Sequence, residues 1–77
     1  MRYSILEVCQ QIAQQNGYNT PNEETEFNQV IDDPIDFAEL LVKTETIISK
    51  ELKDEGISET DFYTVKEYID WTLNIKK

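Results

Sequence analysis

Apolar residues recur at intervals of three or four positions in every patterned segment of this sequence, and this spacing constrains the fold more than any other feature. It is the period of an α-helix with one buried face, whereas a half-buried strand would alternate in steps of two. We therefore predict an all-α protein without a β-sheet. With 77 residues the chain can bury one modest core, so we expect a single domain over residues 1–77.

Turn and cap residues set the limits of two long helices. The first is predicted over residues 2–15. Gly17, just beyond it, is expected to end the helix because glycine readily takes the left-handed conformation. The second is predicted from Asp33 to about Leu52. Asp33 can cap its N-terminus, and Pro34 occupies the first helical position, where the missing N–H group has no intrahelical partner to lose.

Two further helical segments are predicted near the C-terminus. A short turn is expected over residues 58–62, where Ser58 and the aspartate three residues later can form a cap. Thr64 and Glu67 have the spacing of a capping box, which predicts a last helix over residues 65–74. The sequence thus predicts three longer helices, one short third helix and a long first loop, packed as a small bundle.

The long loop over residues 18–32 is polar, so apolar side chains must hold it in place. Phe27, Val30 and Ile31 are the residues expected to do so. The apolar face of the second helix is assigned to Ile35, Phe37, Leu40, Leu41, Thr44, Ile47 and Ile48. Ile35 and Phe37 cannot both point the same way, so one of them is expected to meet the long loop. The residues predicted to be mostly buried are Phe27, Leu40, Leu41, Ile47, Ile48, Val65 and Leu73.

The formal net charge is −9, and most of it lies in the first half of the chain. Residues 1–42 carry eight carboxylates against Arg2 alone, while residues 43–77 carry eight against six lysines. Such a surface repels nucleic acid and anionic membranes and attracts basic protein surfaces. We therefore expect a protein partner with a basic patch, and neither nucleic acid nor a membrane. Solubility alone would explain the same charge.

The residues for several kinds of chemistry are missing. Cys9 is the single cysteine and there is no histidine, so an internal disulfide is excluded, and transition-metal sites and histidine-based catalysis lack their usual residues. Cys9 lies in the apolar stripe of the first helix, which predicts a buried thiol. Asp32 and Asp33 are adjacent, but a carboxylate pair in front of a proline is more simply a helix cap. We predict no enzyme activity, no catalytic residue and no metal site.

The order of the segments resembles that of acyl and peptidyl carrier proteins, which have a helix, a long loop, a second helix opening with Asp-Ser-Leu, a short third helix and a fourth. The stretch DDPIDFAELL is similar to the family pattern DSLDFVEL, and ISETDFYTVKEYIDW resembles the stretch from the third helix into the fourth. Phe27 stands where the family has a loop phenylalanine. The matching positions in the second helix are Asp33, Ile35, Asp36, Phe37, Glu39 and Leu40. The resemblance implies a four-helix, carrier-like bundle.

Pro34 departs from the family at the decisive position. Carrier proteins have a serine there, and its hydroxyl receives phosphopantetheine. Proline has no hydroxyl, so the resemblance implies a carrier-like protein without this cofactor. The serines that the chain does contain lie elsewhere in the pattern: Ser4, Ser49 and Ser58.

The resemblance also implies a docking face, because carrier proteins dock on basic patches of partner enzymes through carboxylates of the second helix. The residues that match this face are Asp32, Asp33, Asp36 and Glu39. Lys43 follows one turn after Glu39 and can pair with it, which would make this an ordinary solvated face.

Two functional hypotheses follow. The first is a non-catalytic interaction module that serves a biosynthetic enzyme, and we expect it to be monomeric. The second is a small acidic inhibitor, similar to bacterial immunity proteins, that masks the basic surface of a toxin or nuclease. Either protein would be cytoplasmic, since the sequence has no apolar run long enough for a signal peptide or a membrane span.

Overall fold

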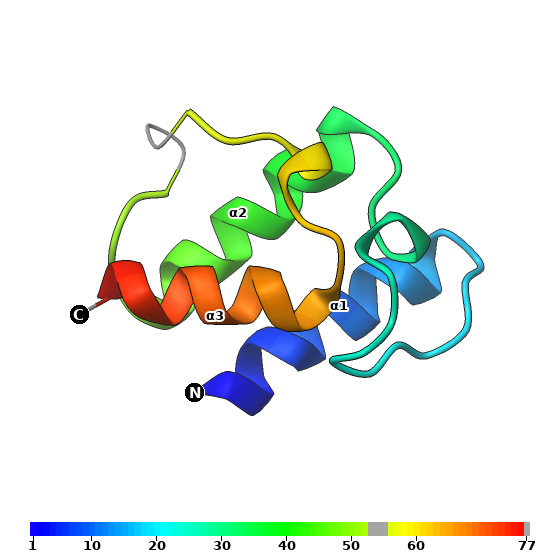
Figure 1. Cartoon of the computed structure of the whole chain (residues 1–77), viewed down its shortest axis with the longest axis horizontal. Helices are drawn as coiled ribbons and strands as arrows, with labels where there is room; N and C mark the ends of the chain where they lie inside the picture. Colours follow the sequence, from blue (N-terminus) through cyan, green and yellow to red (C-terminus); the bar gives the residue numbers. More distant parts are fainter. Residues whose placement is uncertain (53–55, 77) are drawn as a thin grey trace.

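The computed structural model describes residues 1–52 and 56–76, and that part of the chain contains three α-helices: α1 (Arg2–Gln15), α2 (Pro34–Ile48) and α3 (Val65–Lys76). Its connections include two short 3-10 helices: η1 (Phe27–Gln29) and η2 (Glu59–Asp61). α1 packs against both α2 and α3, and α1 begins on the side of the molecule where α3 ends (Figure 1). The only β pairing in the described residues is an isolated antiparallel bridge between Glu26 and Thr64. The prediction of an all-α protein is confirmed, with a 3-10 turn where the short third helix was expected.

α1 has the predicted bounds, because one apolar stripe faces the core and a glycine follows its C-terminus. Gly17 has a φ of 78°, a left-handed conformation that strains a residue with a Cβ atom. Burial raises the pKa of the Cys9 thiol to about 12, so the thiol stays protonated and inert at neutral pH. The predicted buried thiol is therefore confirmed. The residues of α1 that are fully buried are Ile5, Cys9, Ile12 and Ala13.

Phe27 holds the long loop against the core, as predicted. Its side chain is fully buried, and its ring centroid lies 5.3 Å from that of Tyr68 and 5.5 Å from that of Phe62. The ring of Phe37 meets it edge-on, with the centroids 6.2 Å apart. These four rings join η1, α2, α3 and the segment after η2 into one aromatic cluster. The other two residues predicted to anchor the loop, both buried, are Val30 and Ile31.

Main-chain hydrogen bonds tie the same loop to the start of α3. The Phe27 N–H donates to the Tyr63 carbonyl at 2.8 Å, and the Val65 N–H donates to the Thr25 carbonyl at 3.0 Å. The second bond satisfies a donor in the first turn of α3, which has no partner within its own helix. The loop is therefore fixed by backbone bonds as well as by apolar contacts.

The capping box predicted at the start of α3 is half formed. Thr64 Oγ1 accepts the Glu67 N–H at 3.3 Å, which is the first bond of the box. For the second bond, Glu67 Oε1 should accept the Thr64 N–H, but it accepts the Tyr63 N–H instead, at 3.1 Å. The main-chain bonds around the bridge with Glu26 use the Tyr63 carbonyl and the Val65 N–H and not the Thr64 N–H, and the Glu67 side chain binds one residue earlier than the box requires. α3 then runs to Lys76, two residues beyond the predicted end.

α2 begins at the predicted residue but ends earlier than expected. Ser49 takes a left-handed conformation with a φ of 59°, and its N–H donates to the Glu45 carbonyl at 2.8 Å. The expected continuation to Leu52 is therefore wrong. Leu52 is nevertheless fully buried, and its N–H donates to Glu45 Oε2 at 2.7 Å, so a non-helical segment brings it to the core.

The core assignment of α2 is right except at its first turn. Ile35 was placed on the buried face, yet its side chain is 80% exposed, while Phe37 is 4% exposed. The side chains of two helical residues that are two positions apart point in directions that differ by about 200°, so burying Phe37 turns Ile35 outward. Of the predicted core, the half-buried members are Ile47 and Leu73, and the buried members are Phe27, Leu40, Leu41, Ile48 and Val65.

Candidate protein-docking face at the start of α2

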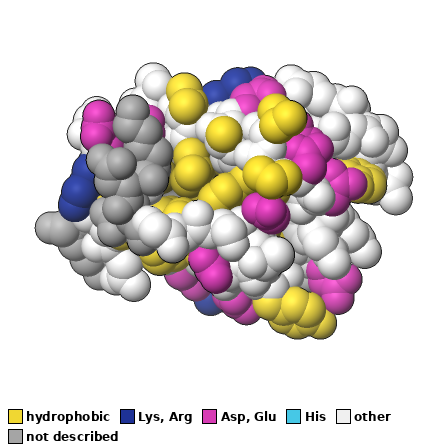
Figure 2. Space-filling model, turned by 90° about the horizontal axis from the view of Figure 1, so that it is seen from above, with side chains coloured by type: hydrophobic (Ala, Val, Ile, Leu, Met, Phe, Trp, Pro, Cys, Tyr) yellow, Lys and Arg dark blue, Asp and Glu magenta, His cyan; other side chains and the backbone are white. Residues whose placement is uncertain are grey.

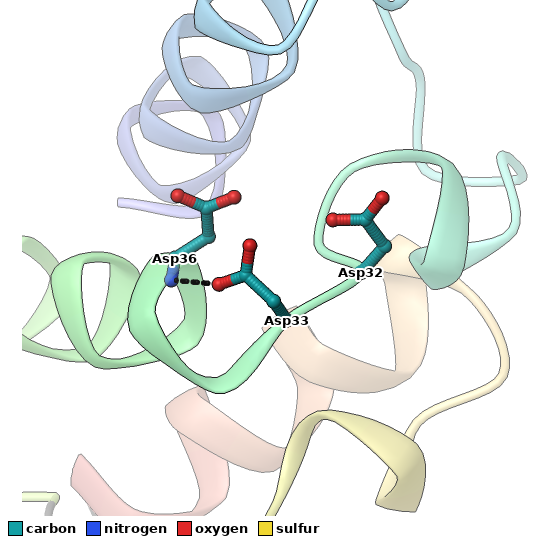
Figure 3. Close-up of side chains that lie close together, drawn as sticks. All are labelled: Asp32, Asp33 and Asp36. Atoms are coloured by element: carbon teal, nitrogen blue, oxygen red, sulfur yellow. Dashed lines mark hydrogen bonds between the residues drawn. The ribbon is translucent and has the colours of Figure 1, made fainter.

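The first turn of α2 is built around a cap. Asp33 has extended backbone and its Oδ1 accepts the Asp36 N–H at 2.8 Å, which satisfies a helix donor that has no partner in the helix (Figure 3). Pro34 occupies the first helical position, as predicted. Asp32, Asp33 and Asp36 bring carboxylate oxygens within 4.8 Å of one another. The dipole of α2 favours this negative charge at its N-terminus.

Two neutral donors hold this group of carboxylates in place. The Tyr18 hydroxyl donates to Asp32 Oδ2 at 2.7 Å, and the bond to the carboxylate raises the pKa of Tyr18. Asn16 Nδ2 donates to Asp36 Oδ2 at 2.9 Å, which joins the C-terminal end of α1 to the first turn of α2. Helix capping and these two bonds account for the close spacing of the three side chains.

Glu39 lies outside this group. It forms an ion pair with Lys43, with 3.3 Å between Oε2 and Nζ, and both side chains are 38% exposed. The four residues predicted for the docking face are thus divided, with three together at the start of α2 and Glu39 farther along, partly neutralised by the lysine. An exposed pair of this kind is worth a few tenths of a kcal/mol, roughly 0.3–0.5, so it opens easily for a partner.

Sequence reasoning missed two apolar members of this face. Ile35 is 80% exposed and Val42 is 61% exposed, and their separation of seven residues places them on one side of α2. Figure 2 shows the molecule from above, and the start of α2 and η2 lie near the top in Figure 1. On this side, hydrophobic and acidic side chains are mixed, and there are few basic side chains. The signal was present in the sequence, because both residues lie opposite the buried face of Leu40 and Thr44. We define the docking face as Asp32, Asp33, Ile35, Asp36, Glu39 and Val42.

A small cavity adjoins the docking face. It lies between η1 and η2, has a volume of about 370 Å³, and Asp32 forms part of its rim. Ile31 and Phe62 line it as well, together with Tyr63, whose side chain is 67% exposed. The sequence does not predict this cavity, because its walls come from two stretches far apart in the chain, residues 28–32 and 59–63.

Arg2, the single basic residue among residues 1–42, forms ion pairs with two carboxylates of the chain itself. Arg2 Nη2 lies 2.7 Å from Glu23 Oε1 and 2.8 Å from Asp70 Oδ1, which joins α1 to the loop and to α3. Hydrogen bonds from Lys66 and Arg2 lower the pKa of the Asp70 carboxyl. The guanidinium of Arg2 therefore pairs with carboxylates outside the docking face and leaves the charge of that face in place.

The chain matches no family model, no curated protein and no solved structure. Among the described residues, no helix combines the length and apolar character that crossing a membrane requires.

Proposed function

We propose that this protein is a non-catalytic interaction module that binds a basic surface of a partner protein through the docking face. The observation that carries the proposal is the exposure of Ile35 and Val42 on the same side of α2 as the Glu39 carboxylate. Apolar side chains surrounded by charged ones are the usual composition of a protein interface, where the former supply affinity and the latter supply orientation and association rate.

The charge of the face specifies the chemistry of the partner. Asp32, Asp33 and Asp36 form a concentrated negative group at the N-terminus of α2. Their field favours a partner that presents Lys or Arg around an apolar patch, and it disfavours acidic partners and phosphates. Glu39 would exchange its intramolecular lysine for a basic group of the partner.

The proposed relationship to carrier proteins rests on the order of the elements and on the opening of α2. η2 lies where the short third helix of a carrier protein would be, and Asp33 caps a helix that starts at the matching position. Pro34 presents only ring carbons at the attachment position, so the residues do not fit phosphopantetheine. We therefore propose a carrier-like bundle that serves a biosynthetic enzyme without carrying cargo.

A pair of matched double variants tests the docking face. Glu39→Gln with Val42→Ser removes one carboxylate and one exposed apolar side chain from α2. Glu7→Gln with Tyr3→Ser does the same on the outer side of α1, where Tyr3 is 68% exposed. In affinity purification from the native cell, followed by binding kinetics with the captured protein, we expect the α2 variant to lose at least about tenfold in affinity, about 1.4 kcal/mol.

The control variant should bind like the natural protein, and binding by the natural protein should weaken as salt rises. Equal affinity of the two double variants would contradict the docking face. The identity of the captured protein separates the two functional hypotheses, since a biosynthetic enzyme fits the carrier-like proposal and a nuclease or toxin fits the inhibitor.

A second test concerns Pro34. Incubated with coenzyme A and a broad-specificity phosphopantetheinyl transferase, the natural protein is expected to gain no mass, because attachment needs a hydroxyl at this position. Pro34→Ser supplies that hydroxyl between Asp33 and Ile35, and it should leave the helix start intact because Asp33 still caps it. Mass spectrometry should then show the phosphopantetheine adduct on a fraction of the serine variant. Modification of the natural protein would contradict the alignment with carrier proteins.

A further inference from the structure

The cavity between η1 and η2 combines an apolar wall with a negative rim. Ile31, which is 1% exposed, lines it together with the aromatic rings of Phe62 and Tyr63. Asp32 and Glu59 also line it, one from the segment before α2 and one from η2. Among the described residues, those that line the cavity include no lysine or arginine, so its carboxylates have no cationic partner inside it.

Tyr63 is held in position although it is exposed. Its hydroxyl donates to Glu26 Oε1 at 3.1 Å, and its N–H donates to Glu67 Oε1 at 3.1 Å. Both ends of the residue are therefore anchored, and ordering the ring on binding would cost little conformational entropy. The two anchoring carboxylates also add negative charge next to the ring, which strengthens its attraction for a cation.

We propose that this cavity receives the side chain of an arginine from the basic partner. An arginine has an apolar stem and a planar cationic end, and the cavity offers surfaces for both. The stem would lie against Ile31, and the guanidinium would stack on the aromatic rings and donate to Asp32 and Glu59. This inference rests on the proposed function, because it names the anchor of the partner that the docking face binds.

The size and the hydrogen bonding of the cavity support one long side chain as its occupant. About 370 Å³ is at the lower end of the range for small-molecule sites, which is roughly 300–1,000 Å³. Asp32 Oδ2 already accepts the Tyr18 hydroxyl, but a carboxylate has about four acceptor positions and can accept a guanidinium N–H as well. Arginine fits better than lysine, because a forked donor can reach carboxylates on two segments while one face of it stacks.

The test uses small probes and does not need the partner. ¹⁵N-labelled protein is titrated with Nα-acetyl-arginine amide and with its lysine analogue, Nα-acetyl-lysine amide. A third titration uses Nα-acetyl-citrulline amide, which has nearly the same shape as the arginine probe without the charge. We expect weak, saturable shifts of the backbone amides of Ile31, Phe62 and Tyr63 with the arginine probe, at least fivefold weaker binding of the lysine analogue, and no saturation with citrulline. Equal binding of the citrulline probe would overturn the inference.

Two variants with the same change of charge locate the site. Glu59→Gln removes a carboxylate of the cavity, whereas Glu7→Gln removes an exposed one from the outer side of α1, away from the docking face. We expect the first to weaken the arginine probe at least fivefold and the second to leave it unchanged. Equal effects would mean general charge attraction and would overturn the proposed cavity. Tyr63→Ser, at an exposed position, should also weaken the probe, and the dispersion of each spectrum shows that the variant is folded.

The outcomes distinguish this inference from the function on which it rests. If the α2 double variant loses the partner but Glu59→Gln binds the arginine probe normally, the docking face stands and the cavity assignment fails. If the arginine probe binds as described but the α2 double variant retains full affinity for the partner, the proposed docking face fails and the cavity is a site for arginine alone.

Discussion

Replacing Phe27 by alanine is expected to destabilise the protein by about 3–5 kcal/mol. A domain of this length has a total stability of roughly 4–12 kcal/mol, so the variant would be largely unfolded near the lower limit. Phe27 is fully buried and its ring contacts those of Phe37, Phe62 and Tyr68. Truncation would leave a void where helices and loop meet, and the long loop would lose its main anchor.

Urea denaturation followed by circular dichroism measures this effect. Phe27→Leu is the matched control, because it keeps an apolar side chain while losing the aromatic contacts, and it should cost about 1–2 kcal/mol. If Phe27→Ala unfolds at the same urea concentration as the natural protein, the aromatic cluster does not hold the fold together.

Replacing Leu40 by alanine is expected to cost about 2–5 kcal/mol. Leu40 is fully buried on α2, and its carbonyl accepts the Thr44 hydroxyl at 2.8 Å. Thr44 Oγ1 in turn accepts the hydroxyl of the buried Tyr68 at 2.8 Å. Shortening the side chain would therefore open a void beside a buried polar network, where entering water would compete for its hydrogen bonds.

Val42→Ala is the control for Leu40→Ala, since Val42 lies on the same helix but is 61% exposed. Alanine is the better helix former, so this variant should match the natural protein within about 0.5 kcal/mol. Thermal melts of the two variants side by side would show the difference. A Leu40→Ala melting temperature within a degree or two of the control would contradict the assignment of Leu40 to the core.

These stability changes bear on the proposed function. Phe27 and Phe37 join η1 to α2, and the carboxylates of Asp32 and Asp36 are held by side chains from the loop and from the end of α1. Loss of the aromatic cluster would therefore loosen the docking face before any of its own residues is changed. Binding measurements on the docking variants need a matching check of stability for this reason.

Much of this protein follows from local sequence. The bounds of α1, the cap of Asp33 before Pro34, the position of η2 and the buried thiol of Cys9 were all predicted. Each depends on residues within one or two turns of one another. The period of the apolar residues fixes which side of a helix is buried, and cap and turn residues fix where the helix begins, whatever the rest of the chain does.

Other features depended on contacts between distant segments. The apolar pattern predicts that α2 continues to Leu52. The helix ends earlier, at a left-handed Ser49, and the Leu52 N–H donates to the Glu45 side chain. At the start of α3, the Val65 N–H donates to the Thr25 carbonyl of the long loop, a bond between segments far apart in the sequence. The full burial of Leu52 and the bond from Val65 to Thr25 both depend on how the chain packs as a whole, so local propensity alone could not decide these features.

The candidate sites likewise combine features set by the sequence with features set by the packing of the chain. The sequence by itself determined the acidic charge, the helix start and the absence of a hydroxyl at Pro34. Only the tertiary structure attached Asp36 to Asn16 and placed Glu59 and Asp32 on one cavity. The reason is physical: charge and chemical groups belong to individual residues, whereas exposure and the grouping of side chains depend on how the whole chain packs around its core.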